Sequence, residues 1–524
     1  MTRIRQMLTA LIFGCASIGA AFAGGVKFAR PFADHMVLQR GRQVPIWGTG
    51  TPGETVNVSF AGQSVGAVVD AKGEWRVSLQ PLQASKEPRV LSVVSISSEA
   101  RPSRQELSDV LVGEVWICSG QSNAECPIWS RHPHYREGQG GMILQMTVKP
   151  FVRLAKSRGP ASTTPAVDYP VVWTKMTPDD LGWGRRDVTY PSALGYLFAL
   201  ELSNALDIPV GLVDCTWGGT NIDAWTPRSG YANVPSLRDV ADLPILPEAE
   251  FRAAKSNGVY RTVRHAGNYD SWIQQPGVLW NGCVAALAPM ALRGFIWYQG
   301  CNNAGEPERY CDKMHALYNG WSTEFANPGL KMYFAQLAPW GVGWVKMWEA
   351  QSRFEKEEKN SAMVVLNDVG CLTDIHPRDK RTVAKRLALH ALKRDYGFDW
   401  IADNSPTLAS WKIDRGRFIL SFHDVREWYL YNEDWSLSTG FEVAGADGVW
   451  KPAQIENVLG QEAVGKMHGA CRGNVRGKDL VVFAKGVEEP VSLRYLYSKP
   501  WKGNLYNEVD LPLGAFSIEK EMNR

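Results

Sequence analysis

The sequence predicts an α/β protein built on a doubly wound parallel sheet and flanked by β-sandwich structure. Two observations support this fold class. The middle of the 524-residue chain holds five short, nearly continuous apolar runs, as parallel strands covered on both faces do. Both ends instead alternate short β-like runs with glycine-rich turns, which is typical of small β-sandwiches.

The first 23 residues resemble an export signal. Arg3 and Arg5 precede an apolar stretch (residues 8–20), and small side chains around Ala23 form a cleavage site. The stretch is too short to span a membrane, and no later segment is long and apolar enough to do so. We therefore expect a periplasmic or secreted protein; a lipoprotein modified at Cys15 is the less favoured alternative.

The chain changes from short β-like runs to alternating strands and helices, and then back to β-like runs. This change predicts three domains after the signal peptide. Residues 24–105 should form an N-terminal β-sandwich, and residues 106–400 an α/β domain. Residues 401–524 should form a C-terminal β domain or supply strands that complete the N-terminal one.

Strands and helices alternate in the predicted α/β domain. A first helix is expected over residues 192–206, and a second should begin at Pro377, the position that proline favours. The polar segment 229–275 gives no pattern, and one interpretation is an insertion that shapes a pocket. The strand candidates are residues 110–118, 209–215, 292–298, 331–337 and 362–366.

The composition limits the kinds of ligand and partner that the protein is expected to bind. A net charge of +3 leaves no electrostatic footprint for nucleic acid. The 21 tryptophans suit stacking on sugar rings, although most tryptophans are core residues. The nine cysteines include Cys15, and an exported protein can oxidise some of the others, but the pairing and the oligomeric state cannot be read. None of them shows a CxxC or Cys/His pattern with metal-ligand spacing, so we expect no metal and no cofactor.

Polar, glycine-containing sequences follow several predicted strands, at the edge where α/β sheets bind ligands. Ser122 follows the first strand on a tight turn, where a serine can act as a nucleophile, although the turn is not a GxSxG elbow. Gly218 and Gly219 follow the second strand and could offer backbone N–H groups to an oxyanion. Asn303 after the third could donate its amide, and His376 after the fifth could act as a base that Asp374 orients.

These blocks resemble the SGNH hydrolase superfamily and, more narrowly, the sialate O-acetylesterase family, and the resemblance covers nearly the whole mature chain. Flanking blocks near both ends agree as well. The segments that carry the resemblance are GEVWICSGQSN (113–123), WGGTNIDAW (217–225), GFIWYQGCNNAG (294–305) and DIHPRDKRTVAKRLAL (374–389).

The resemblance implies an SGNH-like fold and hydrolysis of an acetyl ester on a sugar through an acetyl-serine, with no metal or cofactor. Ser122 would be the nucleophile, His376 the base and Asp374 its orienting partner. The oxyanion hole would combine the N–H groups of Ser122 and Gly219, with Gly218 as the alternative, and the amide of Asn303. The possible pocket residues are Gln121, Trp217, Gln299 and Cys301.

Three departures from the family pattern stand out. Cys301 replaces an acid of the family's Gly-Glu-Ser-Asn block, and Ala124 and Cys126 alter the segment after the nucleophile. Many SGNH enzymes place the aspartate three residues before the histidine, where this chain has a threonine, so Asp368 is kept as a fallback for Asp374.

The sequence leaves the sugar open. An O-acetylated sialic acid is favoured, and an acetylated plant polysaccharide such as xylan or xyloglucan is the alternative. A non-catalytic carbohydrate-binding protein on an esterase scaffold is the second alternative. A sialate carboxylate would call for a cation in the pocket, and the candidates are Arg185, Arg186, Arg228 and Arg264.

Overall fold

The fold was analysed in a computed structural model. It describes residues 25–96, 102–128, 151–175, 192–256, 271–341, 343–431, 439–457, 472–497 and 502–519. The predicted signal peptide and Cys15 lie outside these ranges, as do Arg185, Arg186 and Arg264.

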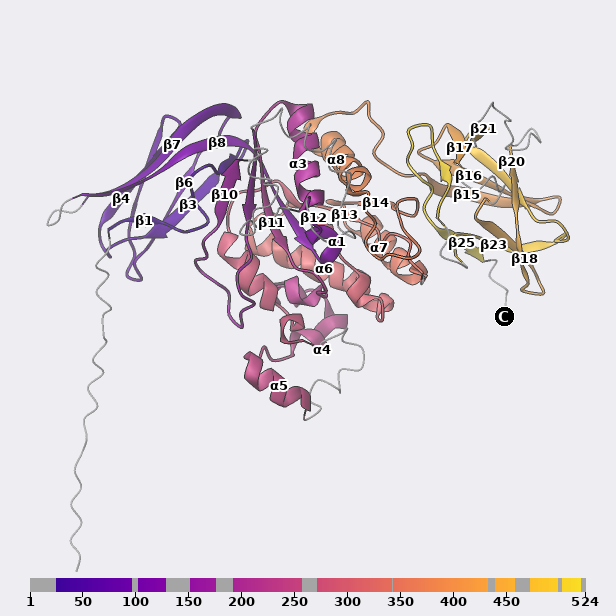
Figure 1. The fold of residues 1–524 in the computed structure, drawn as a ribbon, viewed down its shortest axis with the longest axis horizontal. Helices are drawn as coiled ribbons and strands as arrows, with labels where there is room; N and C mark the ends of the chain where they lie inside the picture. Colours follow the sequence, from indigo (N-terminus) through magenta and orange to yellow (C-terminus); the bar gives the residue numbers. More distant parts are fainter. Residues whose placement is uncertain are drawn as a thin grey trace, which may run out of the picture.

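A mixed, mainly parallel sheet forms the centre of the molecule, which confirms the α/β class. All five predicted strands are present, and helices cover both faces: α3 (Ala193–Leu206) and α8 (Lys380–Tyr396) on one, α6 (Pro307–Glu324) and α7 (Val345–Glu357) on the other (Figure 1). At one edge of this central sheet, β10 runs antiparallel to β9. Across the sheet the strands are β10 (Val172–Lys175), β9 (Val152–Lys156), β11 (Val210–Thr216), β8 (Ser103–Gly120), β12 (Gly294–Tyr298), β13 (Lys331–Ala335) and β14 (Ser361–Val364).

The order of the strands places a switch point at β8. The chain builds one half of the sheet with β9 and β11 on one side of β8, and the other half with β12, β13 and β14 on the opposite side. The connection after β8 leads to β9 on one side, and the connection after β11 crosses to β12 on the other; α/β sheets bind ligands beyond the carboxyl ends of the strands at such a point. Ser122 follows the carboxyl end of β8 directly.

Strand β8 also belongs to the N-terminal β structure. Its first part pairs antiparallel with β7 (Ser85–Ile96) and parallel with β2 (Val37–Gln39), before its second part enters the central sheet. The inward side chains of both regions form one apolar core. The other N-terminal strands are β1 (Lys27–Phe28), β3 (Val44–Thr49), β4 (Thr55–Phe60), β5 (Gln63–Val68) and β6 (Glu74–Leu79).

Among the described residues beyond 406, the strands pair with one another in three small sheets. These sheets pack around a separate apolar core. Figure 1 shows these strands at the opposite end of the molecule from β1–β7. They are β15 (Thr407–Asp414), β16 (Arg417–His423), β17 (Glu427–Tyr431), β18 (Phe441–Gly445), β19 (Trp450–Pro452), β20 (Gln454–Glu456), β21 (Arg472–Arg476), β22 (Asp479–Phe483), β23 (Pro490–Tyr495), β24 (Leu505–Tyr506) and β25 (Phe516–Glu519).

Helix boundaries follow local capping. The Oγ of Ser192 accepts a hydrogen bond from the backbone N–H of Gly195 (2.9 Å) and begins α3 where the sequence predicts it. The predicted start of α8 at Pro377 is wrong. The helix begins at Lys380, because the carboxylate of Asp379 accepts from the N–H of Thr382 (2.9 Å) and caps it there.

The polar segment after Ser229 contains two further helices, α4 (Arg238–Ala241) and α5 (Glu248–Ser256). The short helix α1 (Ser122–Glu125) follows β8. Within the described ranges, no helix combines the length and the apolar character that a membrane crossing requires.

Candidate functional site

The turn after β8 exposes Ser122 at the switch point. Gly120 has a φ of +132°, and a Cβ on it would overlap the backbone of Tyr298. Only glycine fits this position, so the chain can turn sharply and begin α1 at Ser122. The side chain of Ser122 is half-buried, which leaves it accessible to a small ligand.

The structure brings Ser122 and His376 together. The Nε2 of His376 lies 2.9 Å from the Oγ of Ser122, which is hydrogen-bond distance for a general base and its nucleophile. The two residues are far apart in sequence, since His376 lies in the connection between β14 and α8. The amide of Asn123 donates to the carbonyl of Ile375 (3.0 Å), and the buried Lys380 donates to the amide oxygen of Asn123 (2.8 Å). These contacts tie the histidine connection to α1.

Asp374, rather than Asp368, lies beside the histidine. One carboxylate oxygen of Asp374 accepts the backbone N–H of His376 (2.9 Å) and lies 3.6 Å from its Nδ1. Asp368 instead makes a two-point ion pair with Arg386, at 2.8 and 2.7 Å. That pair is nearly buried and commits the carboxylate of Asp368 elsewhere.

The neighbouring glycines differ in what their N–H groups do. The N–H of Gly218 donates to the carboxylate of Glu125 (2.6 Å), so it is already engaged. Gly219 has a φ of +70°, and a Cβ on it would meet nothing within 4 Å. The amide of Gln274 donates to the carbonyl of Gly219, which fixes the next peptide group along the chain. Of the two, Gly219 is therefore better suited to present its N–H to a ligand.

The amide of Asn303 has a fixed orientation. Its oxygen accepts from the backbone N–H of Ile222 (3.0 Å) and from the side chain of Gln299 (2.8 Å). Its nitrogen donates one hydrogen to the carboxylate of Glu306 (2.7 Å). With both lone pairs of the oxygen engaged, the amide nitrogen has to face away from them, and the whole side chain is buried.

A buried ion network supports this asparagine. The Nζ of Lys313 lies 2.6 Å from carboxylate oxygens of both Glu306 and Asp223, and all three side chains are almost completely buried. Burial raises the pKa of Glu306, and Asp223 raises it further, while Lys313 opposes both. No local sequence motif marks this network, or the supporting residues Glu125 and Gln274, so sequence patterns did not predict them.

The predicted pocket residues have different surroundings. The side-chain oxygen of Gln121 accepts the N–H groups of Gly300 and Asn302, each at 3.2 Å, and Gln299 is fully buried. Both glutamines therefore hold the loops around the site. Cys301 is half-buried next to Asn302, in the turn that also carries Asn303.

Trp217 is half-buried at the same edge. The guanidinium of Arg158 lies over its ring, 4.5 Å from the centroid, and donates to Glu125 (2.9 Å). A cation and an aromatic face thus lie next to the glycine turn. Arg228 instead donates to the carbonyls of Ala241 and Leu243.

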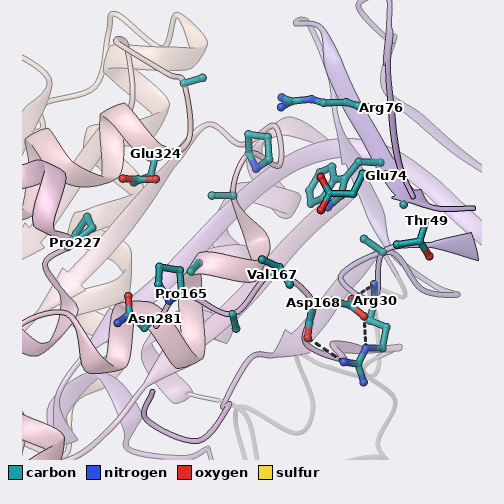
Figure 2. A pocket seen from close by; sticks show the side chains of 18 of the residues that line it. Arg30, Thr49, Glu74, Arg76, Pro165, Val167, Asp168, Pro227, Asn281 and Glu324 are labelled. Carbon is teal, nitrogen blue, oxygen red and sulfur yellow. Dashed lines mark hydrogen bonds and ion pairs between the residues drawn. The ribbon is translucent and has the colours of Figure 1, made fainter. Parts of the chain in front are cut away.

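A separate cavity of about 1100 Å³ lies between the N-terminal β structure and the α/β region. Figure 2 shows it between Thr49, Glu74 and Arg76 on one wall and the segment that carries Pro165 and Val167. Of the predicted residues, Arg228 lines this cavity, whereas Ser122 and His376 do not. The seven cysteines of the described ranges are all unpaired.

Curated proteins of similar sequence indicate the family of this chain. No protein-family model matches the chain. It is 30% identical over 509 residues to the sialate O-acetylesterase of Rattus norvegicus, covering 90% of this chain and 91% of that protein. The sialate O-acetylesterase of Homo sapiens is 28% identical over 485 residues, covering 85% and 86%.

A solved structure also matches. The crystal structure of a carbohydrate acetylesterase from Xanthomonas citri aligns with a TM-score of 0.75 at 27% identity, covering 94% of this chain and 99% of that one. Sequence similarity to the rat protein extends over 90% of the chain, so the chain belongs to the sialate O-acetylesterase family.

Proposed function

We propose that this protein is an SGNH-type serine esterase that removes O-acetyl groups from carbohydrates. The observation that carries the proposal is the 2.9 Å contact between the Oγ of Ser122 and the Nε2 of His376 at the switch point of the sheet. Relatives named sialate O-acetylesterase and a carbohydrate acetylesterase of similar fold support the substrate class.

In the first half-reaction, the Oγ of Ser122 attacks the acetyl carbonyl carbon while His376 takes its proton. The negative charge that forms on the carbonyl oxygen is stabilised by the N–H groups of Ser122 and Gly219 and by the amide of Asn303. The sugar oxygen then leaves with the proton from His376, and the acetyl group stays on Ser122.

In the second half-reaction, His376 takes a proton from water, and the resulting hydroxide attacks the acetyl-serine. The same donors stabilise the second oxyanion. Its collapse releases acetate and returns the proton to Ser122 through His376. Asp374 keeps the imidazole oriented and stabilises its charged form in both halves.

We infer that the favoured sugar is an O-acetylated sialic acid. Such a substrate carries a carboxylate, which a guanidinium recognises well. Arg158 lies over Trp217 beside the glycine turn and supplies that charge. Replacing Arg158 by alanine should raise KM for O-acetylated sialic acid and leave KM for a neutral acetyl ester unchanged; an equal change for both would refute this role.

The domain limits at residues 24–105, 106–400 and 401–524, and export with cleavage near Ala23, belong to the same proposal. A protein found in the periplasm or medium whose N-terminus is Gly24 would support export. A cytoplasmic protein that retains residues 1–23 would refute it.

Acetate release tests the activity directly. The wild type, Ser122→Ala and His376→Gln are compared on an activated acetyl ester, on O-acetylated sialic acid and on acetylated xylan. Ser119→Ala is the control, because this serine lies on the same strand but donates to the carbonyl of Cys215 (2.8 Å).

Acetate from the wild type and the control, but not from Ser122→Ala, supports the serine esterase, and the preferred substrate identifies the sugar. No release by any form refutes it. The function would then be carbohydrate binding on an esterase scaffold.

A further inference from the structure

A second cluster of reactive side chains lies between helices α6 and α7. Cys311 and His315 are one turn apart on α6, and Glu357 is the last residue of α7. The thiol of Cys311 donates to the carboxylate of Glu357 (3.5 Å), and the Nε2 of His315 lies 2.9 Å from the same oxygen. One donor atom from each of the three residues lies within 4.8 Å of the others.

The spacing suits a single tetrahedral ion. Zinc binds sulfur at about 2.3 Å and nitrogen or oxygen at about 2.0–2.2 Å, so its ligand atoms are about 3.3–3.6 Å apart. The separation between Cys311 and Glu357 is already 3.5 Å. The separation between His315 and Glu357 has to lengthen only slightly from its hydrogen-bond value.

The chemistry of the three groups selects the metal. A thiolate, an imidazole and a carboxylate together favour zinc, because calcium and magnesium prefer oxygen ligands alone. The thiol of Cys311 is buried and donates to Glu357, so the metal has to displace the thiol proton.

Access to the cluster is open on one side. The side chains of His315 and Glu357 are 23% and 48% exposed, whereas Cys311 is buried. Arg353 reaches Glu357 (3.5 Å) and Asp312 (3.0 Å) from solvent. Its guanidinium is half exposed, so it can move away when a cation arrives.

We propose that Cys311, His315 and Glu357 bind one Zn²⁺, with water as the fourth ligand. Binding forms one bond each to sulfur, nitrogen and oxygen and releases the thiol proton to solvent. The ion links α6 to α7 and shares no side chain with the catalytic site proposed above. The expectation of no metal rested on spacing along the chain, and Glu357 comes from a different helix.

Spectroscopy of the cobalt form tests the site. Reduced, metal-free full-length protein is titrated with Co²⁺ and then with Zn²⁺. One equivalent of Co²⁺ should produce the near-ultraviolet band of thiolate-to-cobalt charge transfer, and Zn²⁺ should remove it. Cys311→Ser should lose the band. Cys371→Ser, a half-exposed thiol outside the cluster, should keep it.

Zinc affinity gives a second measurement that does not depend on how Cys311→Ser folds. His315→Gln and Glu357→Gln should each weaken zinc binding at least about 10-fold, since even outer-sphere changes reach that size. Arg353→Gln should bind zinc as tightly or more tightly, because a competing cation is removed. A band that persists in Cys311→Ser, or equal zinc affinity in the wild type and both glutamine variants, overturns the site.

Discussion

Replacing Lys313 by methionine should strongly destabilise the fold. The ammonium group is fully buried and lies 2.6 Å from two buried carboxylates, those of Asp223 and Glu306. Removing one partner of a buried ion pair typically costs about 3–5 kcal/mol, because the remaining charge has no compensation. Here one cation serves two carboxylates, so we expect a loss at the upper end of that range.

The loss of folding stability in Lys313→Met should grow as the pH rises. Burial already raises the pKa of Glu306, and without Lys313 the hydrogen bond from Asn303 is left to oppose that effect. The folded variant therefore holds a proton that the unfolded chain has released above its ordinary carboxyl pKa. Its stability should fall as pH rises through this window, by about 1.4 kcal/mol per pH unit for one proton.

Urea unfolding between about pH 5 and pH 8 measures both effects. Lys346→Met is the matched control, because Lys346 pairs with Glu308 at 3.5 Å in solvent, and exposed pairs contribute about 0–1 kcal/mol. The double variant Lys313→Met with Glu306→Gln should be more stable than Lys313→Met alone, since one buried charge is gone.

Activity provides a second readout. The network orients Asn303 through Glu306, so kcat of Lys313→Met should fall by about 10-fold, less than the roughly 10²–10³-fold loss expected when an oxyanion donor is removed. A cost below about 1 kcal/mol, independent of pH, would refute this account of the buried network.

Three further predictions follow from single contacts. Asp374→Asn should lower kcat by about 10²–10⁴-fold, whereas Asp368→Asn should lower the free energy of unfolding instead. Kinetics and urea unfolding of both variants would separate the two roles. The reverse pattern would identify Asp368 as the group that orients His376. Burial acts to raise the pKa of Asp403, but hydrogen bonds from His390 and Arg394 lower it to about 2. The resulting stabilisation, roughly 2 kcal/mol, is complete above about pH 4 and lost as pH falls toward 2, so Asp403→Asn should flatten the acid limb of the unfolding curve. Gly120→Ala should cost at least about 1–3 kcal/mol in thermal or urea unfolding, because it forces a strained backbone against a carbonyl, and an unchanged midpoint would contradict the geometry of this turn.

Sequence patterns predicted the central strands because buried parallel strands are continuous apolar runs. They missed β9 for a specific reason. This strand carries Arg153 and Lys156, and the second of these ion-pairs with Asp214 at 2.9 Å on the neighbouring strand β11. A charge that is neutralised by a distant partner looks like a surface residue in the sequence, so the strand pattern is lost.

The residues of the candidate site also fall into those that sequence patterns predicted and those that they did not. Ser122, His376 and Asn303 follow strands in recognisable blocks, and the resemblance identified them together. The supporting groups have no such signal, since Lys313 and Asp223 are 90 residues apart and meet only in the fold. The domain limits and the catalytic roles stay predictions until the variants are measured.

The shared strand β8 has a consequence for how the chain can be divided. It contributes edges to both the N-terminal β structure and the central sheet, and one apolar core joins the two. Cutting the gene ahead of residue 103 would remove β2 and β7 and leave unsatisfied peptide groups along the first part of β8, the strand that continues to the nucleophile turn. The N-terminal region is therefore no detachable module, and it should melt together with the centre, in a single transition that the C-terminal sheets need not share.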